Sequence, residues 1–299
     1  MKQEVSTGAL IGRIWRHCYS AKPRTAKMLL RQTALFVRCL RQLPALRAWH
    51  QQNSATSPDL LARHPLMPAF LDRPYLSTTW TVTSRMKVIQ DHYGQAKRFP
   101  IFGFAHDAST GLASLSEIEA DLNFRLEKPL WFVNEGEVAL SLFSGETRLY
   151  SLLFTLGQRN GVQAAYVGAL QGINSDDARD IYRTLTHAAH GVRPRDLLFN
   201  GFRMLCNALA IENIFAVSDE KNARRSPYFA GGEHLHFSLD EAWIEYGGVL
   251  TEDGFYEISP VIAYRDPEDI PSRKRAQYRR RYEMLDSIAA RIRLAVSPE

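Results

Sequence analysis

Two arginines at the start of a predicted helix are the strongest candidates for binding an anion. Arg193 and Arg195 flank Pro194, and proline is favoured in the first turn of a helix. Backbone N–H groups at a helix N-terminus attract negative charge, and arginine binds phosphate through paired hydrogen bonds. The sequence therefore predicts that Arg193 and Arg195 hold the phosphates of a bound ligand.

A carboxylate lies among aromatic residues further along the chain. Glu245 stands between Trp243 and Tyr246, in a segment (243–246) with the short apolar pattern of a strand. A carboxyl group beside aromatic rings can have a raised pKa and act as a general base. The alternative is an outward-facing polar residue, and the sequence favours it because acidic side chains are seldom buried.

Four histidines form two closely spaced pairs. His187 and His190 are three apart on a predicted helix, and His234 and His236 alternate along a predicted strand, so each pair shares a face. Four imidazoles are able to hold a metal ion. No cysteine or glutamate at the spacing of a known metal motif accompanies them, so the sequence favours ordinary histidines and predicts no metal site.

The elements that must position these groups indicate an α+β fold with a mixed, mainly antiparallel sheet. Alternating apolar residues predict strands at 122–126, 138–142, 148–156, 163–170, 214–218, 243–246 and 255–258, with a turn at 109–111. Apolar residues at helical spacing predict helices over 8–49, 79–97, 175–189, from Pro194 onward and from Pro271 toward the C-terminus. Residues 50–78 are rich in Pro, Ser and Asn and are predicted to be a linker. We therefore expect a basic helical region with its linker over 1–78 and an α+β domain over 79–299.

Positive charge is concentrated at both ends of the chain. Residues 1–50 carry ten Lys or Arg and one acidic residue, and residues 271–299 carry eight and three, within a net charge of +5. In the first region Lys27, Arg31, Arg38 and Arg41 share one helical face and Leu29, Phe36 and Leu40 share another. The basic face is either the solvated side of a core helix, which is the commoner arrangement, or a surface for an anionic membrane.

The remaining composition bounds the compartment and the partners. The three cysteines, Cys18, Cys39 and Cys206, show no disulfide or zinc spacing and favour a reducing compartment. No secretory signal and no membrane span is predicted. We expect a cytoplasmic protein, with peripheral attachment to the inner membrane as the alternative. Tyr278 and Tyr282 interleave with arginines but fall on the apolar stripe of their helix, so a nucleic-acid partner is not expected.

Several segments resemble the VirK/YbjX family of Gram-negative bacteria. They are YVGALQG (166–172), HGVRPRDLLFNGF (190–202), IFAVSD (214–219), WIEYGG (243–248) and PSRKRAQYRRRYEMLD (271–286). The resemblance implies a role in virulence, in integrity of the cell envelope and in survival of cationic antimicrobial peptides. It implies no particular reaction, so no catalytic residue is carried over from it.

The order of elements after Leu140 is also similar to that of the GNAT acyltransferases. This fold-level similarity implies that an acyl donor, acyl-CoA or acyl-carrier protein, binds after the fourth strand, at either Gln171–Asp177 or Gly191–Asp196. Neither segment has the glycine spacing expected for close approach to a phosphate, and Arg193 and Arg195 make the second electrostatically better. Asn222 and Tyr228 follow the buried strand at about the spacing of the GNAT Asn and Tyr. A fold does not establish a function.

Two functions of different classes follow. The first is an accessory enzyme that transfers an acyl or related group to an envelope component, with Arg193 and Arg195 binding the donor and Gln171, Asn222 and Glu245 near the reacting centre. The second is a non-catalytic protein whose basic ends attach it to anionic lipid, to lipopolysaccharide phosphates or to a partner protein. The substrate and the oligomeric state are left open by the sequence.

Overall fold

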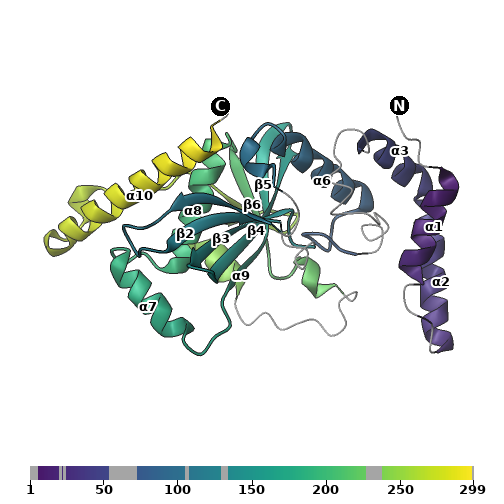
Figure 1. Ribbon diagram of the computed structural model, residues 1–299, viewed down its shortest axis with the longest axis horizontal. Helices are drawn as coiled ribbons and strands as arrows, with labels where there is room; N and C mark the ends of the chain where they lie inside the picture. The colour runs from purple at the N-terminus through teal and green to yellow at the C-terminus, as the bar shows by residue number, and fades with distance from the viewer. Residues whose placement is uncertain are drawn as a thin grey trace.

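The computed structural model of the chain describes residues 6–19, 22, 25–53, 73–104, 108–128, 134–226 and 238–297. Figure 1 shows a twisted sheet in the middle of the molecule with helices on its two faces. Helices α7 and α10 lie toward one end, and three N-terminal helices lie at the other (Figure 1). The predicted Tyr228, His234 and His236 fall outside the described residues.

The eight-stranded sheet has the order β1-β2-β3-β4-β5-β6-β8-β7. Strands β5 and β6 are parallel, and all the other neighbours are antiparallel. This confirms the predicted α+β class and the mixed, mainly antiparallel sheet. The strands are β1 (Ser109–Ser114), β2 (Leu122–Glu127), β3 (Val138–Ser144), β4 (Thr147–Arg159), β5 (Val162–Gly172), β6 (Asn213–Val217), β7 (Val249–Leu250) and β8 (Phe255–Ile258).

One face of the sheet is covered by helices from the C-terminal half of the chain. Phe154 of β4 packs against Phe202, whose ring centroid lies 5.0 Å away, in a core that also contains Trp243 and Ile288. These side chains are fully buried, and removing them from water is the main term that holds the helices to the sheet. The helices are α7 (Ala178–Ala188), α8 (Pro194–Ala208), α9 (Leu239–Glu245) and α10 (Arg275–Val296).

The opposite face is covered in part by α6 (Val82–Ala96), which confirms the helix predicted over 79–97. The side chain of Thr81 accepts a hydrogen bond from the N–H of Ser84 and caps its first turn. Val88, Ile89 and Tyr93 of this helix are buried in a second core cluster. Separate core clusters therefore pack against the two faces of the sheet.

The N-terminal region is helical, as predicted over 8–49, and it forms three separate helices. They are α1 (Thr7–Cys18), α2 (Ala26–Arg41) and α3 (Leu43–Asn53). Side chains of Ser6 and Thr25 cap α1 and α2, so each helix has its own start signal. Pro44 stands in the first turn of α3, where a proline costs no hydrogen bond. The chain reversals let Ile14, Cys39 and Leu46 become buried together.

Three local predictions are corrected by tertiary contacts. Residues 243–246 are not a strand: Ser238 caps α9, and Asp240 and Glu241 in its first turn suit a helix N-terminus. The predicted turn at 109–111 is part of β1, which pairs with β2 along the sheet edge. The predicted linker is wrong at its C-terminal end, because Tyr75 and Leu76 are fully buried.

Over the described part of the chain, no helix is both long and apolar enough to cross a bilayer.

The short remaining elements are single turns of 3-10 helix. They connect the larger elements and contribute few buried side chains. They are η1 (Pro100–Phe102), η3 (Ala223–Arg225), η4 (Pro267–Asp269) and η5 (Ser272–Lys274). Cys18, Cys39 and Cys206 are all buried.

Candidate functional site

The two predicted anion-binding arginines lie where α8 begins. Arg193 has an extended backbone and is the N-cap, and Pro194 occupies the first helical position. Asp196 stands in the same first turn, where its charge favours the helix dipole. This local sequence holds two guanidinium groups and a carboxylate within one turn.

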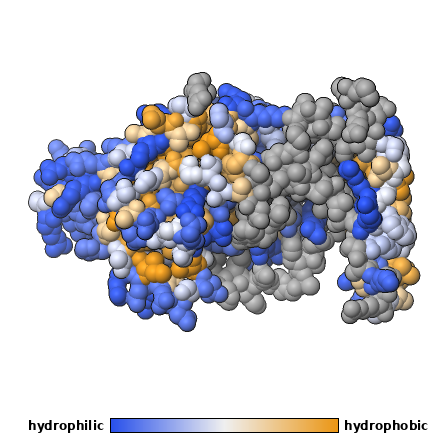
Figure 2. Space-filling view, in the orientation of Figure 1, coloured by the Kyte–Doolittle hydropathy of each residue, from blue (hydrophilic) through white to orange (hydrophobic). Residues whose placement is uncertain are grey.

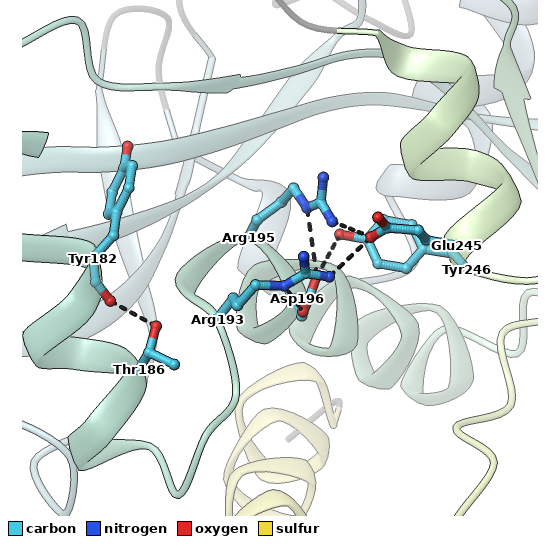
Figure 3. Close-up of polar contacts among 7 residues, drawn as sticks. All are labelled: Tyr182, Thr186, Arg193, Arg195, Asp196, Glu245 and Tyr246. Atoms are coloured by element: carbon cyan, nitrogen blue, oxygen red, sulfur yellow. Dashed lines mark hydrogen bonds and ion pairs between the residues drawn. The ribbon is translucent and has the colours of Figure 1, made fainter. Parts of the chain in front are cut away.

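Glu245 reaches this turn from the end of α9 and completes a four-charge cluster (Figure 3). Arg193 Nη2 donates to Glu245 Oε2 at 2.8 Å, and Arg193 Nε donates to Asp196 Oδ2 at 2.6 Å. Arg195 forms ion pairs with Glu245 and with Asp196. The hydroxyl of Tyr246 donates to Asp196 Oδ1 at 3.1 Å. The fold therefore brings together three of the five predicted site residues, and two carboxylates balance the two cations.

The electrostatics of this cluster contradict the property expected of Glu245. Hydrogen bonding from Arg193, followed by the charge of Arg195, lowers the pKa of Glu245. Its side chain is also 47% exposed, so burial does not offset this effect. The raised pKa that a general base would need is therefore not found, whereas the half-exposed side chain matches the outward-facing polar residue that the sequence favours. A catalytic role for Glu245 stays a prediction without that support.

Gln171 lies on the other side of the sheet from this cluster. In β5 it stands opposite Ser151 of β4, and the Ser151 hydroxyl bonds to that of Ser141 at 2.8 Å. The preceding residue, Leu170, faces the core beneath α8. Successive side chains alternate between the faces of a strand, so Gln171 points away from Arg193.

Asn222 is held at the point where β5 and β6 cease to pair. Their parallel pairing runs from Ala164 with Asn213 to Val167 with Ala216. Beyond it, Asn222 Nδ2 donates to the carbonyl of Gly168 at 3.1 Å, and Asn222 Oδ1 accepts from the N–H of Arg224 at 2.9 Å. The Asn222 side chain is buried, and its hydrogen bonds connect the segment after β6 to β5.

The alternative phosphate loop at Gln171–Asp177 is closed by hydrogen bonds within the protein. The N–H of Ile173 donates to the carbonyl of Leu149 at 2.9 Å and to the hydroxyl of Tyr182 at 3.0 Å. The N–H of Asp177 donates to the Ser175 hydroxyl at 3.3 Å. These donors already have partners, which makes the loop a poor cradle for a phosphate.

A buried acidic centre on the α6 side was not predicted. The hydroxyls of Tyr75 and Tyr93 donate to the two carboxylate oxygens of Glu137, at 3.0 and 2.9 Å. Tyr75 also bonds to Thr155 at 2.6 Å. Glu137 is fully buried, and a second buried carboxylate, Glu135, forms an ion pair with Arg224. Sequence reasoning missed the centre because Tyr75 belongs to the segment taken for a linker.

The comparisons with known proteins place the chain in a family. A family model described as a protein of unknown function, DUF535, matches residues 24–293. This chain belongs to the DUF535 family. The match spans all five predicted site residues and the buried acidic centre. No solved structure matches the chain.

Relatives of this DUF535 protein occur in two bacteria. It is 30% identical over 239 residues to YbjX of Escherichia coli (strain K12), over 77% of this chain and 72% of that protein. It is 25% identical over 254 residues to an uncharacterized protein of Haemophilus influenzae, over 84% of this chain and 83% of that protein. A second uncharacterized Haemophilus influenzae protein is 27% identical over 176 residues, which are 59% and 58% of the two chains. These matches confirm the resemblance to the VirK/YbjX family.

Of the four paired histidines of the DUF535 protein, His187 and His190 lie within the described residues. His187 lies in α7, but His190 follows the helix in a left-handed conformation, with φ of 53°. Among the described residues, no three His, Cys, Asp or Glu side chains are grouped to hold a metal ion. His92, which the sequence did not single out, is buried on α6, and its Nδ1 accepts from the N–H of Leu156 at 3.1 Å.

Proposed function

We propose that this protein is an envelope-associated accessory protein that attaches peripherally to anionic phospholipid through α1 and α2. The observation that carries the proposal is an exposed apolar stripe beside a basic one on α2. Leu30 is 72% exposed, Leu29 is 46% exposed and Val37 is 42% exposed. Figure 2 shows hydrophobic and hydrophilic residues reaching the surface together at this end of the molecule.

The helical spacing places the two stripes side by side. Leu30 and Val37 are seven residues apart, which is two helical turns, so they lie on one face. Lys27, Arg31 and Arg38 are exposed and lie about 60° to 100° around the helix from Leu30. A helix that lies in a membrane interface presents this combination of apolar and cationic side chains.

The same helix is held to the protein by its other side. Cys39 and Gln32 are buried, and Phe36 packs on a core cluster that includes Leu10 and Ile14 of α1. The Phe36 ring lies 5.4 Å from that of Trp15. Because intramolecular packing uses one face only, the exposed stripe remains available to a second surface.

We expect charge reversal on α2 to weaken vesicle binding at least tenfold. Each Lys or Arg near an anionic leaflet contributes about 1 kcal/mol, so Arg31→Glu with Arg38→Glu removes about 2 kcal/mol and adds repulsion. The measurement is co-sedimentation of the full chain with phosphatidylglycerol vesicles at low and physiological salt. Pure phosphatidylcholine vesicles should bind little.

The matched control changes the net charge equally at the other end of the molecule. Arg273 and Lys274 are exposed in η5, next to the start of α10. Arg273→Glu with Lys274→Glu should leave binding unchanged, as should Leu294→Ser on α10, where Leu294 is 79% exposed. Leu30→Ser should weaken binding. Equal loss in both pairs of charge variants, or none in either, contradicts attachment through α2.

This proposal places the protein in the biology implied by the VirK/YbjX resemblance. Attachment to a cytoplasmic leaflet fits a role in envelope integrity, virulence and survival of cationic antimicrobial peptides. The basic charge of residues 1–50 supports the same orientation, with α2 toward the lipid. Lipopolysaccharide phosphates are the alternative anionic surface, and a vesicle series that contains lipopolysaccharide distinguishes it.

A second candidate, acyl or related group transfer, rests on the position where the pairing of β5 with β6 ends. Their pairing ends at Val167 and Ala216, and the position beyond it holds Gly168 and the polar Asn222. This observation supports an enzyme, whereas the ion-paired state of Arg193 and Arg195 weighs against donor binding there.

Group transfer predicts a rise in melting temperature with an acyl donor. At a donor concentration 100 times Kd, linkage stabilises the folded state by about 2.7 kcal/mol. Differential scanning fluorimetry with acyl-CoA and with acyl-carrier protein measures the rise, and Arg193→Ala with Arg195→Ala should abolish it. Arg98→Ala, which alters an exposed arginine after α6, is the control. No rise with either donor removes the enzyme candidate.

A further inference from the structure

A basic cavity lies between the end of α7 and the first turns of α10; Gly191 of the predicted segment Gly191–Asp196 lines it, but Arg193, Arg195, Asp196 and Glu245 do not. Its volume is about 720 Å³, and its lining includes Arg183, Thr186, His187, His190, Gln277 and Arg280. None of the residues that line it is acidic. Figure 1 places α7 and α10 at the end of the molecule opposite to α1 and α2, so the cavity is independent of the proposed membrane contact.

One wall of the cavity is the turn at His190 and Gly191, which several hydrogen bonds hold in place. His190 and Gly191 are both left-handed, with φ of 53° and 83°, and the N–H of Gly191 donates to the carbonyl of Thr186 at 2.7 Å. The His190 carbonyl accepts from Gln277 Nε2 at 3.1 Å and from Arg281 Nη2 at 2.9 Å. A non-glycine residue with positive φ is uncommon and persists where the surroundings fix it. This turn joins α7 to α10 and sets the distance between their side chains.

The positive charge of the arginines in the cavity is not balanced by carboxylates, whereas Asp196 and Glu245 balance the two arginines at the start of α8. Arg280 has no carboxylate partner among the described residues, whereas its neighbour Arg279 faces Glu283 at 3.9 Å. Arg183 pairs with Asp180 at 3.1 Å, but both side chains are mostly exposed, and such pairs contribute little. Two guanidinium groups therefore face one cavity with a surplus of positive charge.

We propose that this cavity binds a ligand that carries a phosphate monoester. Guanidinium groups bind phosphate oxygens in pairs, and Arg183 and Arg280 approach from two helices. The side chains of His187 and Gln277 add polar groups for the remainder of the ligand. The volume exceeds that of inorganic phosphate and suits a phosphorylated sugar or a lipid headgroup. Both sources share the monoester chemistry, and the experiment separates them.

The test is isothermal titration of the full chain with four probes. They are glucose 6-phosphate, glucose, dihexanoyl phosphatidic acid below its micelle concentration and dihexanoyl phosphatidylcholine under the same conditions. We expect a phosphate monoester to bind and its unphosphorylated or choline counterpart not to bind. The sugar and lipid arms show which source the cavity accepts. Equal binding of glucose and glucose 6-phosphate, or no binding of either monoester, overturns the proposal.

Matched arginine variants locate the binding. Arg183→Ala with Arg280→Ala should raise Kd at least tenfold, and Arg179→Ala with Arg279→Ala, on the same two helices but outside the cavity lining, should leave it unchanged. Arg280→Ala alone should raise Kd severalfold, and it removes no ion pair that folding needs. An equal loss of binding in the control pair overturns the proposal. Vesicle binding through α2 should be the same in all these variants, so failure here is distinct from failure of the membrane proposal.

Discussion

Replacing Gly168 with alanine is expected to destabilise the protein by about 3 kcal/mol, the upper part of the range for overpacking a folded interior. A Cβ atom at this position meets the carbonyl oxygen of Glu135 at 2.1 Å and Leu76 Cδ2 at 2.6 Å. Backbone atoms cannot rotate out of the way as a flexible side chain can. Either the 134–137 segment or β5 must therefore move.

The consequence reaches further than one contact, because Gly168 lies at an irregularity of β5. The register between β4 and β5 shifts between Leu153 and Phe154, which leaves Gly168 as the extra residue. Its carbonyl holds Asn222, and its Cα faces the segment that carries Glu135. Displacing it disturbs the place where β5 and β6 part, on which the group-transfer candidate depends.

Chemical denaturation followed by tryptophan fluorescence measures this effect. Gly94→Ala is the matched control, because Gly94 lies within α6 and an added Cβ there has nothing within 4 Å. That control should raise stability by about 0.5–1 kcal/mol through helix propensity. A Gly168→Ala protein as stable as the original would show that the segments are not closely packed.

The second large effect is expected at Glu137. Glu137→Ala removes the acceptor of two buried tyrosine hydroxyls, those of Tyr75 and Tyr93. A buried donor left without a partner costs about 1–3 kcal/mol, and a cavity adds to it, so we expect a loss of about 3–5 kcal/mol. The result should be loosening of the segment around Tyr75 from the body of the protein.

Partial variants separate the contributions at this centre. Tyr93→Phe deletes one donor and keeps the ring, so it should cost about 1–2 kcal/mol. The double variant Glu137→Ala with Tyr93→Phe should be less destabilised than the sum of the single losses, because both delete the same bond. Glu146→Ala is the control: Glu146 is exposed in a turn and pairs with Arg125, and its loss should not change the denaturation midpoint. Additive losses would mean that the tyrosine and the carboxylate are not coupled.

The alternation of apolar and polar residues predicted most of the strands, because the apolar residues of each strand are the ones that the fold buries. Leu122, Phe124 and Leu126 alternate in the sequence and are all buried beneath α8 and α10. The strand predicted at 243–246 is wrong because the Ser238 cap and the burial of Trp243 stabilise a short helix, which outweighs the strand preference of aromatic and β-branched residues. Ser109 and Gly111, which predicted a turn at 109–111, lie in an edge strand. Their hydrogen-bonded pairing with β2 outweighs their weak preference for a turn.

The sequence by itself determined the fold class, the family and the basic character of the two ends, because alternation, caps and charge are properties of neighbouring residues. It also marked Arg193, Arg195 and Glu245 as polar groups of interest. Only the tertiary structure decided that these side chains, about 50 residues apart, neutralise one another, and that Gln171 faces the other side of the sheet. Pairing of distant charges and the burial of Glu137 depend on long-range packing, and no local pattern encodes which distant segment will supply the partner.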